Sequence, residues 1–312
     1  MQILSIGNFT TGWDNSICDE EHIAKALEDL GHEVTRGQRE SIVPEDTNYD
    51  FVLIAQWNGY AVDMVAKLKN IYECPIIYWA FDYQMDKNGE AEPEEWHVRL
   101  VNECDLFLSK EIAHKQTYER MGAKFRWLAQ DFAPQFLDIP TQTFPKEYDV
   151  VFTGSHLPYA PERTKLLKLV DSVYDLHVFS VTPEQWKAEG LKNVHPPIMD
   201  RGLPELYAKA KINLSIDWKY STGYWSDRNA QIMACKGFVL FRHVPMSEAV
   251  FRDYIEYFHT PQQCLDKIDY YLKNEKEREQ ISAWGYQYAQ NNLKVINRVK
   301  DMLVLVGEIL GG

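Results

Sequence analysis

The alternation of short apolar runs with longer segments of helical periodicity constrains the fold of this chain more than any other feature. Residues 51–55, for example, form a continuous apolar run of strand length, whereas residues 20–30 place Ile23, Leu27 and Leu30 at helical spacing. Strands that are buried on both faces and joined by crossover helices have this pattern. The sequence therefore predicts an α/β protein built on doubly wound parallel sheets.

The alternation occurs twice. In the first half it predicts strands at residues 3–6, 33–35, 51–55, 76–79, 106–109 and 124–127, with helices at residues 20–30, 62–70 and 112–120. In the second half it predicts strands at residues 148–152, 176–180, 212–216, 238–241 and 255–258, with helices at residues 163–173, 183–189, 203–210, 227–235, 262–272, 275–291 and 295–310. A stretch without periodicity, residues 134–145, separates the halves and predicts a linker.

The predicted organisation is two Rossmann-like domains, residues 1–140 and 147–292, followed by a C-terminal helix within residues 293–312. A chain of 312 residues suits two domains, because single cores rarely grow past roughly 250 to 300 residues. Open α/β sheets bind ligands beyond the carboxyl ends of their strands, so a binding cleft between the two domains is expected.

Composition narrows the function classes. The formal net charge of −13 disfavours non-specific binding to nucleic acid, which depends on Lys and Arg contacts to phosphate. No run reaches the roughly 18 apolar residues of a membrane span, and residues 1–6 enter a strand without a basic leader, so a cytoplasmic protein is expected. The five cysteines are scattered without C-x-x-C spacing, which predicts reduced thiols and no metal site.

The strongest candidate site lies at residues 220–231, which follow the apolar strand 212–216 and open a helix. Ser226 or Asp227 can cap this helix, and its free N–H groups favour an anion such as a diphosphate. Arg228 stands in the first turn, where the helix dipole disfavours a cation, so an anionic ligand is expected for it. The alternative is a surface arginine that pairs with Asp227 or with another acid.

Further residues of this segment complete the predicted nucleotide site. Gln231 lies one turn beyond Arg228, where it can bond a ribose hydroxyl or pack structurally. The predicted binding set also takes in Tyr224 and Trp225, which stand just before the helix.

A second candidate segment opens the second domain. The strand at residues 148–152 runs through Thr153 into Gly154 and Ser155, and a glycine there allows close backbone approach to a ligand. Arg163 and Lys165 in the following helix could neutralise phosphate charge, although helix-face cations are more often solvated.

In the first domain the loop at residues 8–15 carries Gly12 and Trp13, which are predicted to contact donor or acceptor. Asp82 follows an aromatic strand, and a carboxylate enclosed by aromatic rings suits general-base work. The alternative for Asp82 is a turn or capping aspartate.

Several common motifs do not occur in the sequence. It contains no G-x-G-x-x-G after the first strand, no G-x-x-x-x-G-K-[ST], no G-x-S-x-G and no H-E-x-x-H. Dinucleotide oxidoreductases, P-loop kinases, α/β-hydrolases and zincins therefore lose their main support.

The second half resembles the C-terminal domain of group 1 glycosyltransferases, and in particular the spore-maturation (CgeB-like) subset that also occurs in phages. In the second half the resemblance rests on residues 225–240, Val244-Pro245, Phe251, residues 255–258 and residues 270–272. In the first half it rests on Gly31-His32-Glu33-Val34 and residues 104–107. Family members often read R-x-x-E-x-x-A-C-G-G. Here the arginine is Arg228, the acid is replaced by Gln231, and the first glycine is replaced by Lys236.

The resemblance implies a GT-B fold whose C-terminal helix crosses back to the first domain. It implies that residues 1–140 form the acceptor domain and residues 147–292 the nucleotide-sugar donor domain. It further implies a metal-independent transferase that retains anomeric configuration. It implies no cofactor beyond a nucleotide-sugar co-substrate, with UDP-sugar as the expected donor. Arg228, Arg163 and Lys165 would meet the charge of the leaving group.

Two acceptors fit the resemblance: a surface glycan and a hydroxymethylated base of phage DNA. If the protein is phage-encoded, it acts in the host cytoplasm. A basic strip on the first domain would indicate DNA, and five residues hint at one: Lys110, Lys115, Arg120, Lys124 and Arg126. A non-catalytic nucleotide-sugar or glycan binding protein and a sugar-nucleotide epimerase are the alternative functions.

Overall fold

The computed structural model describes residues 1–9, 19–38, 48–55, 60–82, 95–130, 144–198 and 202–311. These residues form two compact units. The first unit takes in the described parts of Met1–Gln130, Thr222–Tyr224 and Val295–Gly312, and the second takes in those of Asp131–Ser221 and Trp225–Lys294. The predicted linker at residues 134–145 falls almost wholly outside the described residues.

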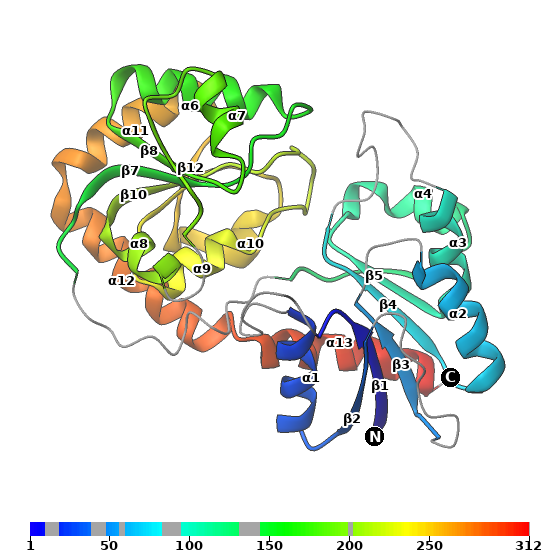
Figure 1. Ribbon diagram of the computed structural model, residues 1–312. Helices are drawn as coiled ribbons and strands as arrows, with labels where there is room; N and C mark the ends of the chain where they lie inside the picture. Colours follow the sequence, from blue (N-terminus) through cyan, green and yellow to red (C-terminus); the bar gives the residue numbers. More distant parts are fainter. Residues whose placement is uncertain are drawn as a thin grey trace. The chain divides into compact units, whose positions relative to one another are not determined.

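The first unit is built on a six-stranded parallel sheet in the order β2-β1-β3-β4-β5-β6 (Figure 1). Its strands are β1 (Gln2–Gly7), β2 (Glu33–Gln38), β3 (Phe51–Ile54), β4 (Ile76–Ala80), β5 (Leu106–Ser109) and β6 (Phe125–Trp127). Every residue of β3, β4 and β5 is buried, as expected for central strands covered on both faces. The six predicted strands are therefore confirmed.

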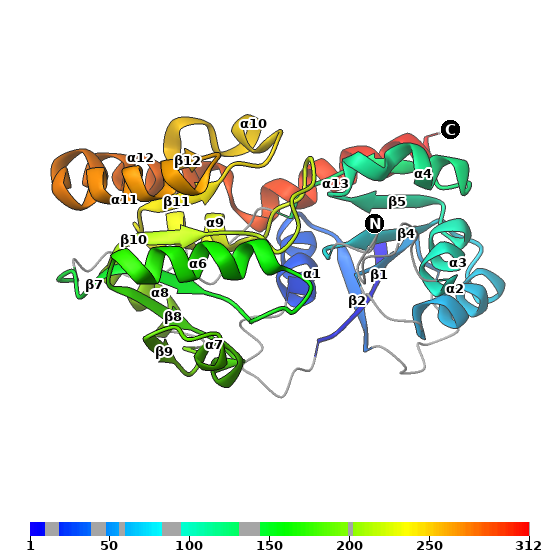
Figure 2. The ribbon, with the colours of Figure 1, turned by 90° about the horizontal axis from the view of Figure 1, so that it is seen from above.

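The helices of this unit are α1 (Asp19–Asp29), α2 (Tyr60–Ile71), α3 (Glu95–Glu103), α4 (Lys115–Arg120, after the 3-10 turn Ile112–His114) and α13 (Val295–Leu310). Helices α2 and α3 lie side by side (Figure 2). Helix α13 packs against α1 through an apolar stripe that buries Val299, Met302 and Val306, and its Glu308 pairs with Arg126 of β6 at 3.1 Å. The C-terminal helix thus belongs to the first unit, as the predicted GT-B fold requires.

The second unit contains a second six-stranded parallel sheet, in the order β12-β11-β10-β7-β8-β9. Its strands are β7 (Tyr148–Thr153), β8 (Leu176–Phe179), β9 (Asn193–His195), β10 (Ala210–Ser215), β11 (Val239–Arg242) and β12 (Glu256–Phe258). Counted from β7, this is the order 3-2-1-4-5-6 of a dinucleotide-binding Rossmann sheet read from its other edge.

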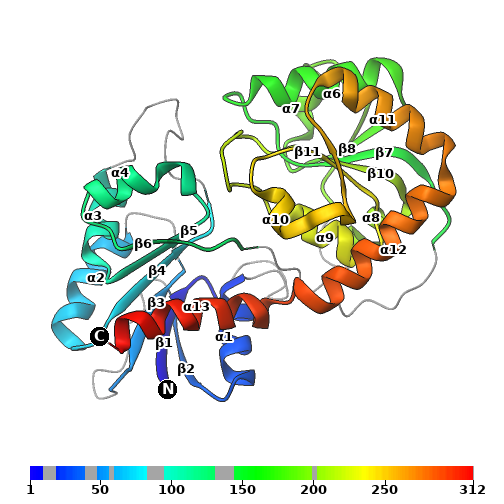
Figure 3. The ribbon, with the colours of Figure 1, turned by 180° about the vertical axis from the view of Figure 1, so that it is seen from behind.

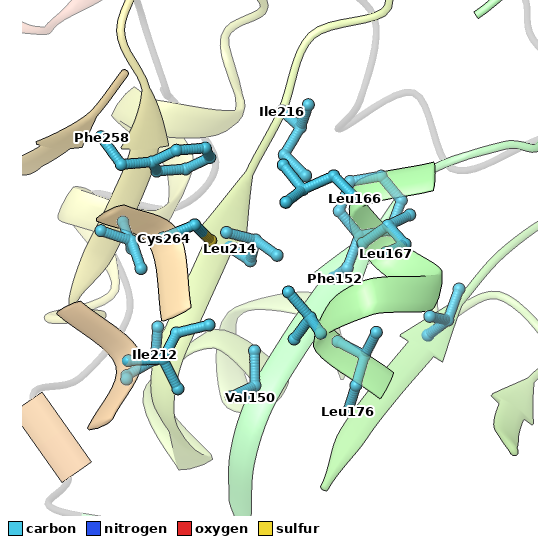
Figure 4. Close-up of a cluster of buried hydrophobic side chains, with 14 of the residues drawn as sticks. Val150, Phe152, Leu166, Leu167, Leu176, Ile212, Leu214, Ile216, Phe258 and Cys264 are labelled. Atoms are coloured by element: carbon cyan, nitrogen blue, oxygen red, sulfur yellow. The ribbon is translucent and has the colours of Figure 1, made fainter. Parts of the chain in front are cut away.

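Helices cover both faces of the second sheet. They are α6 (Pro161–Val173), α7 (Pro183–Ala188), α8 (Gly202–Lys209), α9 (Arg228–Ala234), α10 (Ser247–Phe251), α11 (Pro261–Lys273) and α12 (Glu275–Asn292), with a 3-10 turn at Arg252–Tyr254. Helices α6 and α11 lie over one face and α8, α9 and α12 over the other (Figures 1 and 3). The core between the sheet and the first of these layers includes Val150, Phe152, Leu167 and Leu214 (Figure 4).

Three elements were not predicted. Strand β9 has three half-buried residues at the edge of the sheet, and α10 has only five residues, so neither shows a usable period. Helix α3 presents His97, Leu100 and Val101 to the core, and a histidine in the buried face weakens the apolar pattern.

The order of the second sheet locates its ligand-binding edge. The strand order reverses between β7 and β10, which are neighbouring parallel strands. Ligands of doubly wound sheets bind beyond the carboxyl ends of the strands at such a reversal. A binding site is therefore expected at the residues that follow Thr153 of β7 and Ser215 of β10.

Candidate functional site

Three elements bring a cation and a glycine together at this reversal. Strand β7 ends at Thr153 and continues into Gly154, strand β10 is followed by Ile216 and Asp217, and Arg228 is the first residue of α9. Arg228 Nη2 lies 3.4 Å from the position that a Cβ atom on Gly154 would occupy. Arg228 Nη1 lies 3.9 Å from Asp217 Oδ1. Gly154 and Arg228, which were both predicted to contact the ligand, thus lie side by side in the structure.

Arg228 is an unusually enclosed cation. Its side chain is 15% exposed, its guanidinium carbon lies 5.5 Å from the centre of the Phe152 ring, and its Nη1 atom is buried without a hydrogen-bond partner among the described residues. Burying a charge costs free energy unless it is closely paired and hydrogen-bonded, and the ion pair that the described residues give Arg228, with Asp217, is long. The arrangement leaves a positive charge available for an anion.

Gly154 is required by its surroundings. A Cβ atom there would lie 2.9 Å from Cζ of Phe152, which is too close for any other residue without rearrangement. Its N–H donates to the Phe179 carbonyl at 3.1 Å, and its carbonyl accepts from Trp186 Nε1 at 3.0 Å. The N–H and C=O groups of Gly154 therefore stabilise the turn and do not bind a ligand. Because Gly154 has no side chain, it leaves space for a ligand beside Arg228.

Neutral hydroxyl groups lie beside this cation. The Tyr207 hydroxyl, on α8, lies 3.0 Å from Thr153 Oγ1. Burial raises the pKa of Tyr207 to about 12, although the nearby Arg228 guanidinium acts in the opposite direction. The phenol therefore stays protonated at neutral pH and keeps its ability to donate a hydrogen bond.

Asp217 is the residue that sequence reasoning missed. Its Oδ1 atom accepts the backbone N–H of Ser226 at 3.1 Å, which ties the two ends of the loop between β10 and α9, and its Oδ2 atom is buried without a hydrogen-bond partner in the described part of the chain. Its signal was a carboxylate two residues beyond an apolar strand, at the ligand-binding edge of a parallel sheet.

The start of α9 differs from the prediction. Asp227 stands at the N-cap but makes no capping hydrogen bond with its side chain; it accepts instead from Gln231 Nε2 at 2.5 Å. Capping of α9 by the Asp227 side chain was therefore wrong, and Ser226 Oγ does not cap it either, because it is buried without a hydrogen-bond partner among the described residues. The acid that the alternative expected beside Arg228 is present and is Asp217. Because α9 has only seven residues, Arg228 rather than the helix dipole supplies most of the positive charge.

The two cations of α6 have different surroundings. Arg163 is buried, and its Nη2 atom donates to the Ser155 carbonyl at 2.5 Å, so its guanidinium fixes the turn after β7. Lys165 has a side chain that is 72% exposed and pairs with Glu162 at 2.7 Å. Lys165 thus has the solvated environment that the alternative interpretation expected.

The two aromatic candidates are packed into the protein. Trp225 has no exposed surface and meets Phe251 edge to face at 5.8 Å. Tyr224 belongs to the first unit, where it is buried under the Lys110 ammonium, 5.1 Å from the ring centre. Neither ring has a free face for stacking on a ligand, so the prediction of nucleotide contacts by these side chains does not fit the structure.

In the first unit, the predicted site residues Gly12 and Trp13 lie outside the described residues. Asp82 lies two residues beyond β4 and is exposed, so the expected enclosure of its carboxylate by aromatic rings was wrong. The strand before it is buried, but the chain has left the core by residue 82.

The hinted basic strip is not a free positive surface. Lys110 is buried, Lys115 lies 3.7 Å from Glu119, and Arg126 pairs with Glu308. The side chain of Arg120 bonds back to its own helix at Gln116 and Thr117. Arg120 and Lys124 are exposed, so the part of the hinted strip that is free to meet phosphate is reduced to two of its five cations.

The described residues show neither a metal-binding cluster nor a membrane-spanning helix. Among the residues that the structure describes, no group of three or more His, Cys, Asp or Glu side chains is placed to hold a metal ion. No helix in the same part of the chain is long and apolar enough to cross a membrane. The four described cysteines, Cys74, Cys104, Cys235 and Cys264, are free thiols.

Part of the second half of the chain matches a known protein family. Residues 163–304 match a family model described as glycosyl transferase-like. No curated protein sequence matches the chain.

Solved structures match over the whole chain. T4 phage BGT in complex with its UDP-glucose substrate is 14% identical, with 99% of each chain covered and a TM-score of 0.65. A DNA modifying enzyme, β-glucosyltransferase, solved with and without uridine diphosphoglucose, is 14% identical over 100% of each chain, with a TM-score of 0.69. HepE of Anabaena in complex with UDP-glucose is 12% identical over 99% of this chain and 100% of that one, also with a TM-score of 0.69. The chain has the GT-B fold of these proteins.

Proposed function

We propose that this protein is a glycosyltransferase that moves a sugar from a nucleoside diphosphate sugar, with UDP-sugar as the donor, to an acceptor hydroxyl. The observation that carries the proposal is the enclosed Arg228 guanidinium beside Gly154, at the strand-order reversal of the second sheet. The solved structures of the same fold were obtained with UDP-glucose, which supports a diphosphate as the anion.

The role of Arg228 follows from the charge that develops in the reaction. The acceptor oxygen forms a bond to the anomeric carbon, the bond from that carbon to the diphosphate oxygen breaks, and the diphosphate takes the electron pair. The proton of the acceptor hydroxyl passes to the departing diphosphate. A cation held in place before the reaction stabilises this growing negative charge without reorganisation. The Asp217 carboxylate lies 3.9 Å from the guanidinium, and the Tyr207 and Thr153 hydroxyls supply neutral hydrogen-bonding groups nearby.

Asp227 and Gln231 are the proposed ribose contacts. The family motif that the sequence resembles has an acid at position 231, where this chain has an amide. The structure places the Asp227 carboxylate in a hydrogen bond to that amide. The pair offers both a carboxylate and an amide oxygen to the ribose hydroxyls, so the substitution at position 231 does not remove the acid from this region.

We further propose that the reaction needs no metal ion and retains anomeric configuration, as the resemblance to the CgeB-like subset implies, and that the protein acts in the cytoplasm. Arg228 provides a positive charge that a metal ion would otherwise supply. Turnover that is unchanged by EDTA and an unchanged anomeric coupling in the product NMR spectrum are the expected results.

The acceptor is proposed to be a carbohydrate rather than DNA. The net charge of −13 and the buried or paired cations of the first unit oppose a polyanionic acceptor. The DNA modifying relative keeps DNA in the experiment as a direct competitor of this assignment.

The test is a donor screen that follows UDP release from UDP-glucose, UDP-galactose, UDP-N-acetylglucosamine and UDP-arabinose. Each donor is assayed with water alone, with a panel of methyl glycosides and disaccharides, and with hydroxymethylated DNA. Arg228→Met is the test variant, and Lys165→Met, which removes an exposed cation on α6, is the matched control. Sugar-dependent release that Arg228→Met abolishes and Lys165→Met keeps is the expected result. UDP binding without release under any condition would instead support a non-catalytic binding protein.

A further inference from the structure

Buried polar atoms without a hydrogen-bond partner gather around the loop that joins β10 to α9. Among the described residues, such a partner is missing for Ser215 Oγ, Asp217 Oδ2, Ser226 Oγ and both polar atoms of the Asn229 side chain. Asn229 has no exposed surface. A buried amide that makes no hydrogen bond lowers the stability of a protein, so its presence at this position needs a physical reason.

The packing of α9 on β10 places Asn229 at the end of that strand. A Cβ atom on Gly237 would lie 2.5 Å from Ile232 Cγ2 and 2.8 Å from Asn213 Nδ2, so Ile232 of α9 and Asn213 of β10 meet at this glycine. The strands β10 and β11, which α9 joins, are parallel, so the helix runs antiparallel to them. Asn229, three residues before Ile232, therefore lies roughly 5 Å nearer the carboxyl edge, and Ser215 lies roughly 7 Å beyond Asn213 in the same direction.

The unpaired atoms at the end of β10 complement one another. Asp217 Oδ1 accepts the backbone N–H of Ser226 at 3.1 Å and lies 3.9 Å from Nη1 of Arg228, the residue before Asn229. Asn229 Nδ2 is a donor of the kind that Asp217 Oδ2 lacks, and Asn229 Oδ1 is an acceptor for the Ser226 hydroxyl. A local repacking of this loop would pair all of these atoms.

Two other buried polar side chains of the second unit show the usual pairing with the backbone. Asn213 Nδ2 donates to the Tyr207 carbonyl at 3.0 Å and to the Phe238 carbonyl at 3.3 Å. Ser247 Oγ donates to the Val244 carbonyl at 2.6 Å. Binding sites keep unpaired polar groups at a cost in stability when a second, ligand-bound state uses them.

We infer that Asn229 is a positioning residue for the donor, and that the loop between β10 and α9 repacks when an anion binds at Arg228. The diphosphate draws the guanidinium away from Asp217. The Asn229 amide then donates to Asp217 Oδ2 and accepts from the Ser226 hydroxyl, which holds the carboxylate away from the ligand. The inference rests on the proposed function, because the diphosphate is its trigger.

The experiment compares two buried asparagines of the same unit in the variants Asn229→Leu and Asn213→Leu. Thermal unfolding is followed for both variants and the parent, and UDP affinity is measured by calorimetry. Hydrogen exchange of peptides that cover residues 215–230 is recorded with and without saturating UDP. Arg228→Met is the reference for loss of the nucleotide site.

The two variants should change stability in opposite directions. Asn229→Leu should raise the melting temperature by about 2 to 4 °C, because leucine has the same branched skeleton and removes an unpaired amide. Asn213→Leu should lower it by about 2 to 8 °C, because two backbone carbonyls lose their donor. Asn229→Leu should also weaken UDP binding about 10-fold, whereas Asn213→Leu should bind UDP within about twofold of the parent.

Hydrogen exchange tests the repacking directly. Saturating UDP should slow exchange of the loop in the parent, and Asn229→Leu should lose this protection although its nucleotide site is filled. Unchanged exchange in the parent would overturn the inference. So would an Asn229→Leu variant that melts as low as Asn213→Leu, since the amide would then already be paired, for example by ordered water.

The outcomes also separate this inference from the proposed function. UDP binding that needs Arg228 but is unchanged in Asn229→Leu would reject the inference alone. A parent protein that binds no UDP would reject the proposed function and the inference together.

Discussion

Replacing Arg228 by methionine tests the core of the proposed chemistry. Methionine keeps most of the buried volume but removes the guanidinium that lies against Gly154. Hydrogen bonds to charged groups contribute about 1.5 to 3 kcal/mol each, and a guanidinium can bond a diphosphate with two N–H groups. Allowing for the non-additivity of paired contacts, we expect a loss of about 3 kcal/mol, which is about 100-fold in UDP affinity.

The same substitution has a separate effect on folding. It leaves the Asp217 carboxylate buried with the Ser226 N–H but without its nearby cation, and because that ion pair is long we expect a cost below the roughly 3 kcal/mol of breaking a close buried pair. The double variant Arg228→Met, Asp217→Asn removes both charges and should recover most of the stability. It should not recover UDP affinity, because the guanidinium is still absent.

Calorimetric titration with UDP and urea unfolding of the parent, the single variant and the double variant separate these effects. Lys165→Met serves as the control, because its ammonium is exposed and paired with Glu162, and it should bind UDP within about twofold of the parent. If Arg228→Met binds UDP within about threefold of the parent, the anion does not lie at Arg228 and the proposed site is refuted.

Three further predictions concern other residues. Gly154→Ala places a Cβ atom 2.9 Å from Phe152, so it should lower the free energy of unfolding by about 1 to 3 kcal/mol. Gly307→Ala, in open space on α13, should raise it by about 0.5 to 1 kcal/mol. Urea unfolding measures both, and equal effects would contradict the close-packing argument. Lys236 has a left-handed backbone with φ of 57°, and its ammonium lies 4.8 Å from the centre of the Tyr286 ring. Lys236→Gly and Lys236→Ala both lose this ring contact, but only alanine keeps the backbone strain of a positive φ. Lys236→Gly should therefore be about 1 kcal/mol more stable than Lys236→Ala in urea unfolding. Burial, and to a lesser extent His177, lower the pKa of His195, so the unfolded chain takes up its proton first; the free energy of unfolding should fall as pH drops below about 6.5, and His195→Asn should flatten that slope.

Much of the fold was predictable because parallel strands buried on both faces must be apolar throughout and must be separated by helices. Residues 51–54 and 76–80 are fully buried strands for this reason, and the closing helix at residues 295–310 shows its apolar stripe in the sequence alone. The three-residue edge strand β9 lacks such a requirement, since edge residues are only half buried, and it was missed.

The sequence predicted those site residues whose positions follow from their spacing along a single helix or strand. Arg228 and Gln231 share one helix turn, so their spacing predicted their proximity, and Gly154 was found because it follows a strand. The same local reasoning misassigned Trp225, which stands beside Arg228 in the chain but is buried against Phe251.

Tertiary structure alone decided which groups face the cation. Asp217 is eleven positions from Arg228 and reaches it because the loop between them returns to Ser226, and Arg163 bonds Ser155 across the turn that follows β7. Strand and helix periods are set by neighbours within a few residues, whereas the direction of a loop side chain depends on contacts between distant segments, which are made only when the sheet has formed.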